Sequence, residues 1–346
     1  MKKSILVLAV AATMAAPAAM AETTVYGNVH LSINQADNDV PNADNNLQMS
    51  SNTSAVGVKG SEDLGDGLKA IYKVEFQVGL LGGPDTTPDS GPASAIGNGA
   101  LTGRDQFVGL KGGMGTIKFG TMSSNYKQMG GKVDPLYRTP LEGRGFLGTQ
   151  SDLHKGRGIN RGRQTNTVQY TSPSMGGISL VANTTFSGSN DETTGVGVRW
   201  SNKDIMVYGD WIDGQILAAS NCIAPATCET GSAVKVGGKF SAKAFSVALQ
   251  YEALDGSTNI GVEDVSYIFA AGTFNINKNN AVMLTYGMTD VDELSGDPSD
   301  DSTGIAVAYN HKMSKMTNVY LGYGALDHDV ANSDESMITA GIKKKF

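Results

Sequence analysis

The sequence predicts an all-β protein, a transmembrane, antiparallel, up-and-down β-barrel of about sixteen strands. Three observations predict it. Apolar and polar residues alternate in segments of about ten residues, the length that a tilted strand needs to cross a bilayer. Short and long connections between these segments alternate along the chain. The final run, 337–346, also alternates and ends on the large apolar Phe346. A secreted β-sandwich or solenoid is the rival fold, because its strands alternate as well.

The amino-terminal segment predicts export. Lys2 and Lys3 precede an apolar stretch over residues 5–16, and Ala19-Met20-Ala21 forms a small-x-small cleavage site. This is the pattern of a secretory signal peptide, so residues 1–21 are expected to be removed and residues 22–346 to form the barrel. An uncleaved anchor helix is the alternative, for which the apolar stretch is short.

Composition narrows the class of protein further. Mean hydropathy is −0.18, and after residue 21 no apolar run is long enough to span a bilayer as a helix. A barrel gives this result because only every second strand residue meets lipid. The formal charge of −7 becomes −9 when the two lysines Lys2 and Lys3 are removed, which argues against a nucleic-acid partner. Neither a cofactor nor a metal is implied.

The strands can be followed in order along the chain. In the first, Val25, Val29 and Ile33 face one way and His30 and Ser32 the other. The same alternation recurs over residues 68–78, 245–252 and 318–324, and a weaker segment covers 263–274. Short turns lie at 60–67, 112–115, 172–176, 201–204 and 241–243. Longer polar loops lie at about 35–51, 80–103, 122–162, 214–232, 255–262 and 291–302.

Several of these segments resemble the general diffusion porins of Gram-negative outer membranes, the betaproteobacterial type in particular. The resemblance covers the chain from residue 22 to its end and depends on the order and spacing of short motifs. These are Thr24-Val-Tyr-Gly-Asn28, Val58-Lys-Gly-Ser-Glu-Asp-Leu-Gly-Asp-Gly-Leu-Lys-Ala-Ile-Tyr72, Phe107-Val-Gly-Leu110, Gly115-Thr-Ile-Lys-Phe-Gly120, Asn166-Thr-Val-Gln-Tyr-Thr-Ser-Pro173, Leu284-Thr-Tyr-Gly287, Met313-Ser-Lys-Met-Thr-Asn-Val-Tyr320 and Gly341-Ile-Lys-Lys-Lys-Phe346.

The resemblance implies an outer-membrane homotrimer of sixteen-stranded barrels, surrounded by lipid and lipopolysaccharide, through which small hydrophilic solutes diffuse passively. It also implies that the third long loop, 122–162, folds into the lumen and narrows it. Phe346 would then be the residue that the barrel-assembly machinery recognises. One position departs from the family pattern. Where the second strand usually carries a pore-facing arginine, this chain has Ala55, and Lys73 is expected beside it as a replacement.

The loop 122–162 is basic in an acidic protein, which predicts a weak preference for anions. The alternative is that many of these cations lie solvated at the mouth or bind lipopolysaccharide phosphates. The residues expected to line or tune the constriction are Lys59, Lys69, Lys73, Lys118, Lys127, Asp134, Arg138, Glu142, Arg144, Arg157, Arg161 and Arg163.

Other chemistry is weaker in the sequence. None of the four histidines, His30, His154, His311 and His328, sits in a nucleophile motif, so enzyme activity is not expected. A substrate-specific channel, or an adhesin or receptor acting through external loops, remains the alternative function. Cys222 and Cys228 lie close together in a polar stretch and are expected to form a disulfide in an oxidising periplasm.

Overall fold

A computed structural model describes residues 22–39, 47–81, 101–156, 162–186, 188, 192–214, 231–255, 264–292, 301–330 and 333–346. The strands are β1 (Glu22–Asn38), β2 (Leu47–Ser51), β3 (Ala55–Gly65), β4 (Leu68–Val78), β5 (Leu101–Gly112), β6 (Gly115–Ser123), β7 (Arg163–Thr171), β8 (Ile178–Thr185), β9 (Thr194–Ser201), β10 (Ile205–Gly214), β11 (Gly231–Ser241), β12 (Phe245–Asp255), β13 (Val265–Asn275), β14 (Asn280–Val291), β15 (Ser302–Lys312), β16 (Thr317–His328) and β17 (Glu335–Lys345). Two helical pieces lie between β6 and β7: α2 (Lys127–Val133) and the 3₁₀ turn η1 (Asp152–His154).

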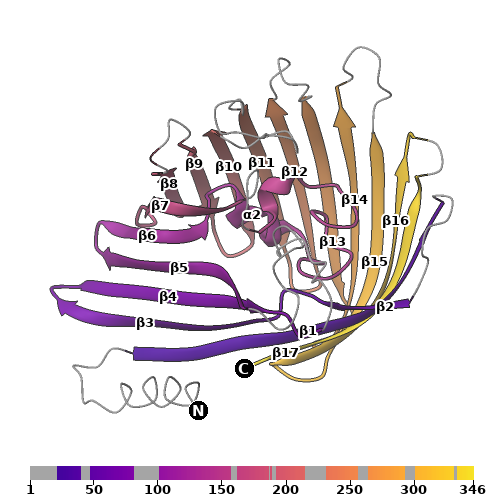
Figure 1. Cartoon of the computed structure of the whole chain (residues 1–346), viewed down its shortest axis with the longest axis horizontal. Coiled ribbons are helices and arrows are strands. Elements are labelled where there is room, and N and C mark those ends of the chain that lie inside the picture. Colours follow the sequence, from indigo (N-terminus) through magenta and orange to yellow (C-terminus); the bar gives the residue numbers. More distant parts are fainter. Residues whose placement is uncertain are drawn as a thin grey trace.

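The strands close into one antiparallel ring, which confirms the predicted fold class (Figure 1). Closure is made by β1, which pairs with β17 from Asn28↔Lys345 to Asn38↔Glu335 and with β3 over Glu22–Asn28. The short β2 pairs with Leu31–Gln35 of β1. Thus β2 and β3 form one strand of the wall, interrupted at 52–54, and the seventeen described segments make sixteen wall strands.

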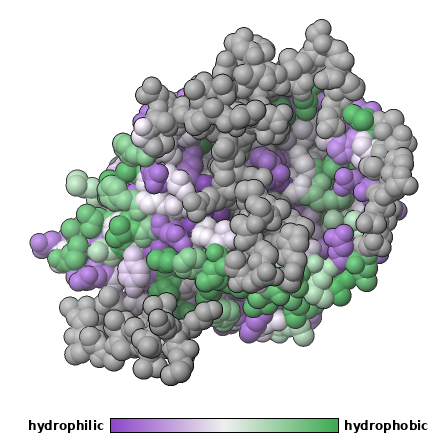
Figure 2. All heavy atoms as spheres, in the orientation of Figure 1, coloured by the Kyte–Doolittle hydropathy of each residue, from purple (hydrophilic) through white to green (hydrophobic). Residues whose placement is uncertain are grey.

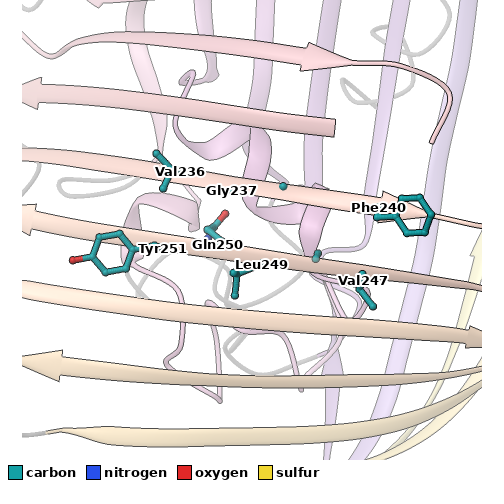
Figure 3. Close-up of a pocket in the computed structure, with 9 residues that line it drawn as sticks. Val236, Gly237, Phe240, Val247, Leu249, Gln250 and Tyr251 are labelled. Atoms are coloured by element: carbon teal, nitrogen blue, oxygen red, sulfur yellow. The ribbon is translucent and has the colours of Figure 1, made fainter. Parts of the chain in front are cut away.

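The predicted alternation is confirmed strand by strand. On β1, Val25 and Ile33 are 54 % and 47 % exposed, whereas His30 and Ser32 are buried. On β11 and β12 the apolar side chains of Val236, Phe240, Val247, Leu249 and Tyr251 line a shallow groove on the outside, while Gln250 is buried (Figure 3). An apolar outside and a polar inside are what a membrane barrel needs and a sandwich does not show.

The distribution of polarity agrees with this arrangement. Figure 2 shows hydrophobic residues along parts of the outline of the molecule and several hydrophilic residues toward the middle of the view. Among the described residues, no helix is long and apolar enough to span a membrane. The weak segment expected at 263–274 is a full strand, β13, which pairs with both β12 and β14.

The long connection between β6 and β7 lies against the inside of the wall. It packs on three apolar clusters. Tyr126 and Leu153 meet Ile212, Ala233 and Leu254. Met129 and Val133 meet Tyr208, Ala248 and Phe269. Leu136, Leu141 and Leu147 meet Ala306 and Ala308. The connection therefore covers the inner face from β10 to β15, and Figure 1 shows α2 crossing the space that the wall encloses.

Candidate constriction site

The wall across from this loop carries a chain of ion pairs on neighbouring strands. Asp105 of β5 accepts hydrogen bonds from Arg163 Nε at 2.8 Å and Lys73 Nζ at 3.1 Å. Lys73 also lies 3.1 Å from Glu75, whose other oxygen is 2.7 Å from Arg104 Nε. Three cations thus share two carboxylates, which leaves this stretch of wall with one positive charge in excess.

Uncharged neighbours fix the same cluster. The Tyr26 hydroxyl donates to Glu75 at 2.7 Å, and Arg104 Nη1 donates to Gln77 Oε1 at 3.1 Å. The β4–β5 register shifts between Val74 and Phe76. Because such a shift re-aims side chains, Arg104 points inward, where it is 1 % exposed, and not along the alternation of its strand.

The expected replacement of the family's arginine by Lys73 beside Ala55 is wrong. Ala55 pairs with Gln77, and Lys73 pairs with Lys59, four residues further along β3. A guanidinium does reach the level of Ala55, that of Arg104, because it donates to Gln77, the direct partner of Ala55. The register differs from the expected one because β3 runs to Gly65, inside the turn expected at 60–67, so that the chain reverses only at Asp66–Gly67.

A second group of cations has no ion pair among the described residues. It comprises Lys59 and Lys118 on the wall and Lys132 and Arg138 on the loop. The ammonium of Lys59 lies 5.2 Å from the Tyr26 ring centre, and that of Lys118 lies 5.1 Å from the Phe107 ring centre. Arg138 lies 5.5 Å from the Tyr137 ring.

Lys118, Lys132 and Arg138 line one opening between the loop and the wall, whereas Lys59 lines a neighbouring pocket. The volume of the opening is about 470 Å³. The residues that line it are Asp105, Phe107, Lys118, Met122, Ser123, Lys127, Gln128, Gly131, Lys132, Tyr137 and Arg138. Among the described residues of this lining Asp105 is the single carboxylate, and two cations already bind it.

A buried carboxylate on β12, Glu252, holds the loop in place. Four side chains donate to it or share a proton with it: Tyr126 (3.0 Å), Ser151 (2.6 Å), His154 (2.9 Å) and Gln250 (2.7 Å). Three of the four belong to the loop, from both its beginning and its end. Burial lowers the pKa of His154 to about 4, so its neutral ring donates to the carboxylate.

Lys235 of β11 provides a second anchor beside Glu252. Its ammonium donates to the Tyr126 carbonyl, lies 3.9 Å from the Tyr126 ring centre and is 3.8 Å from Asp210. Asn125 also donates to Asp210, at 3.1 Å. These contacts pin the start of the loop where it leaves β6.

Other charges serve the interior of the loop. Asp134 accepts from the backbone N–H groups of Leu136 (2.7 Å) and Gly143 (3.0 Å), and burial raises its pKa to about 7. Glu142 accepts from Arg144 Nε at 2.9 Å and from the Arg138 backbone. Lys127 is 4 % exposed and donates to the carbonyls of His154 and Lys155.

The residues expected to form the constriction are therefore divided among several places. Lys118, Lys127 and Arg138 line the opening, and Lys73 and Arg163 bind its carboxylate Asp105. Lys59 lines a neighbouring pocket together with Lys73. Asp134, Glu142 and Arg144 shape the loop that borders the opening. Lys69 lies elsewhere: it pairs with Lys111 and Asp63 beside the Asp66–Gly67 turn, and its ammonium is 3.9 Å from Asp63. Arg157, Arg161, Cys222 and Cys228 lie outside the described residues.

Sequence reasoning missed Glu75, Arg104 and Asp105, which organise the wall cluster. Alternation along β4 could have found Glu75, since it shares a face with Lys73. Arg104 and Asp105 gave no such signal because they stand at the register shift of β5. Lys132 belongs to the basic loop, but its position at the opening depends on how α2 packs.

Comparison with known proteins decides the family. Residues 7–331 match the model of the Gram-negative porins. The chain belongs to the Gram-negative porin family. The barrel is therefore a multi-pass protein of the outer membrane, as its apolar outer face requires. The matched family is one of channel proteins.

Individual porins show how far the likeness extends. The major outer membrane protein P.IB of Neisseria gonorrhoeae is 32 % identical over 211 residues, which are 58 % of this chain and 54 % of that protein. The chain thus spans about half the length of that relative. An outer membrane porin protein of Bordetella pertussis is 25 % identical over the whole of both chains. The anion-selective porin from Comamonas acidovorans shares the fold, with a TM-score of 0.74, 17 % identity, and 94 % of this chain and 100 % of that one covered.

Proposed function

We propose that this porin is a passive diffusion channel for small hydrophilic solutes and ions, with a weak preference for anions. One observation carries the proposal. Lys118, Lys132 and Arg138 face the opening without an ion pair among the described residues, and Asp105, the carboxylate that lines it, is already bound by Lys73 and Arg163. Cations held in a low-dielectric constriction concentrate anions there and repel other cations.

The preference stays weak for two reasons. The wall cluster is close to neutral, because Glu75 and Asp105 balance two of its three cations. The loop end of β12–β14 also carries Asp255, Asp264, Asp290 and Asp292, which line a pocket together. This pocket lies on the outer face, because the outward side chains of Val234 and Tyr251 also line it. Its negative charge offsets part of the attraction that anions feel near this end of the barrel.

Reversal potentials in a KCl gradient across a planar bilayer test this function. The double variant Lys118→Glu, Arg138→Glu should move the reversal potential toward the value of a cation-selective channel, because it replaces two positive charges at the opening by negative ones. Lys69→Glu, at the turn, is the matched control and should have little effect. A wild-type channel that favours potassium over chloride would contradict the proposed preference.

Several expectations accompany the channel. We propose a homotrimer, in which the apolar outer face around β1 and β17 packs against neighbouring copies, and contact of the remaining outer face with lipid and lipopolysaccharide. A heat-modifiable trimer band on a gel tests the homotrimer.

Cleavage after Ala21, the Cys222–Cys228 disulfide and recognition of Phe346 by the barrel-assembly machinery stay predictions. A substrate-specific channel would show saturating flux for one solute, whereas a general channel shows none.

A further inference from the structure

Aromatic rings and unpaired cations meet at the constriction, and this combination suits one class of anion. The opening is lined by Phe107 from the wall and Tyr137 from the loop, together with Lys118, Lys132 and Arg138. Charge alone would attract all small anions alike. Rings that lie beside the charges add apolar contact area, which only an anion with an apolar body can use.

On the wall side, the ring of Phe107 is held next to the charge that would receive the anion. Lys118 lies one strand away with its ammonium 5.1 Å from the centre of the ring. The β6 residue directly paired with Phe107 is Gly120, so no side chain stands at that paired position. Phe107 is only half-buried, and part of its ring thus remains available to a solute.

The loop side repeats this arrangement. The ring of Tyr137 packs onto Gly131 of α2, where an added Cβ would lie 2.8 Å from the ring. The buried guanidinium of Arg144 lies 4.3 Å from the same ring, and that of Arg138 lies 5.5 Å from it. Because Gly131 and Arg144 fix the ring before any solute arrives, a solute that contacts it does not have to order it.

We propose that the constriction binds small aromatic carboxylates in preference to inorganic or aliphatic anions of the same charge. The carboxylate would meet Lys118, Lys132 or Arg138, and the ring would pack on Phe107 or Tyr137. The proposal rests on the proposed anion preference and adds a substrate class to it. One aromatic contact of this kind corresponds to a roughly threefold to tenfold gain in affinity.

Block of the KCl current through wild-type channels in planar bilayers tests the preference, with three probes. Benzoate carries both ring and charge, acetate carries the charge alone, and benzamide carries the ring alone. Benzoate should reduce the current at concentrations about threefold to tenfold below those of acetate, and benzamide should have a weaker effect than benzoate. Equal block by acetate and benzoate would overturn the proposed class.

Variants locate the ring contact. Phe107→Leu and Tyr137→Leu keep every charge. In each variant the blocking concentration of benzoate should therefore approach that of acetate, while the KCl reversal potential stays unchanged. Phe119→Leu is the matched control, since Phe119 lies on the outside of β6 and is 45 % exposed. It should retain the benzoate preference, and an equal loss there would overturn the assignment. Open-channel conductance shows in the same recording that each variant has folded.

The two proposals fail in different ways. A wild-type reversal potential on the potassium side contradicts the anion preference, and the aromatic class falls with it. A reversal potential on the chloride side, combined with equal block by acetate and benzoate, contradicts the aromatic class alone.

Discussion

At the scale of single residues, the position of the constriction loop depends on few buried charged groups. Glu252 accepts hydrogen bonds from Tyr126, Ser151 and His154 of the loop, and Lys235 donates one to the Tyr126 carbonyl. A buried carboxylate is stable only when its oxygens are satisfied, so the wall and the loop depend on each other. Sequence could not predict this pairing, because Glu252 and His154 are 98 residues apart.

Glu252→Gln should loosen the loop. The glutamine keeps the size of the side chain, but its amide group presents N–H donors to the hydroxyls and ring that donate to the carboxylate. The loss should be about 2 kcal/mol of loop stability, seen as noisier single-channel currents and closure at lower voltage. Glu62→Gln, an exposed position on β3, is the control. The same closing voltage in Glu252→Gln and wild type would show that the clamp does not set loop position.

His154 should make the loop sensitive to acid. Burial lowers its pKa from 6.5 to about 4, so its contribution to stability is complete above pH 6.5 and is lost as pH falls toward 4. The loss is at most about 3 kcal/mol. Asp134 acts in the opposite sense: burial raises its pKa to about 7, so its contribution is present at low pH and lost as pH rises through 7.

His154→Gln separates these effects, because glutamine can donate to Glu252 but does not titrate. Current noise recorded from pH 7 to pH 4 should rise less steeply in this variant than in wild type. His328→Gln, near the loop end of β16, should follow the wild-type curve. A wild-type channel whose noise does not change over this range would contradict the role of His154.

At the scale of elements, alternation predicts the strands well and the register at bulges poorly. The strands follow directly from a period of two, and the length of the connection 122–162 marks it as special. Register shifts at Val74/Phe76 and at Gly120/Met122 do not show in the sequence. The first shift places Arg104 and Asp105 opposite Glu75 in the wall cluster. The position of Lys73 opposite Lys59, and not Ala55, follows instead from the β3–β4 hairpin, whose register shifts at Asp63/Gly65.

Gly120→Ala should disrupt the end of β6 where the constriction loop begins. The φ angle of Gly120 is +137°, and an added Cβ would lie 2.3 Å from the Gln106 carbonyl oxygen. Both the strained backbone and the clash favour glycine, at a cost of about 2 kcal/mol or more for alanine. The barrel should therefore lose its heat-resistant gel mobility at a lower temperature. Gly113→Ala, which meets open space, is the control, and equal shifts in both variants would argue against the bulge.

At the scale of the whole molecule, the barrel is closed by the contact between its first and last strands. Phe346 and Gly27 exchange two backbone hydrogen bonds, of 3.0 and 3.1 Å. The ring of Phe346 covers the position where a side chain at residue 27 would stand, 2.5 Å from an added Cβ. Phe346 thus has a packing role at the seam, in addition to the expected role as an assembly signal.

Gly27→Val tests the packing role, because the new side chain would collide with the Phe346 ring and with the Ala55 carbonyl, 2.6 Å away. Refolding of the purified chain into detergent should become less complete, as measured by the heat-modifiable band. Gly209→Ala is the control, an outward strand glycine whose Cβ would be 3.8 Å from its nearest neighbour.

Phe346→Ala distinguishes the packing role from the role as an assembly signal. Packing alone predicts the same refolding defect as Gly27→Val, whereas a recognition signal predicts normal refolding in detergent and reduced assembly in cells. Complete refolding of Gly27→Val would contradict the idea that this contact closes the barrel.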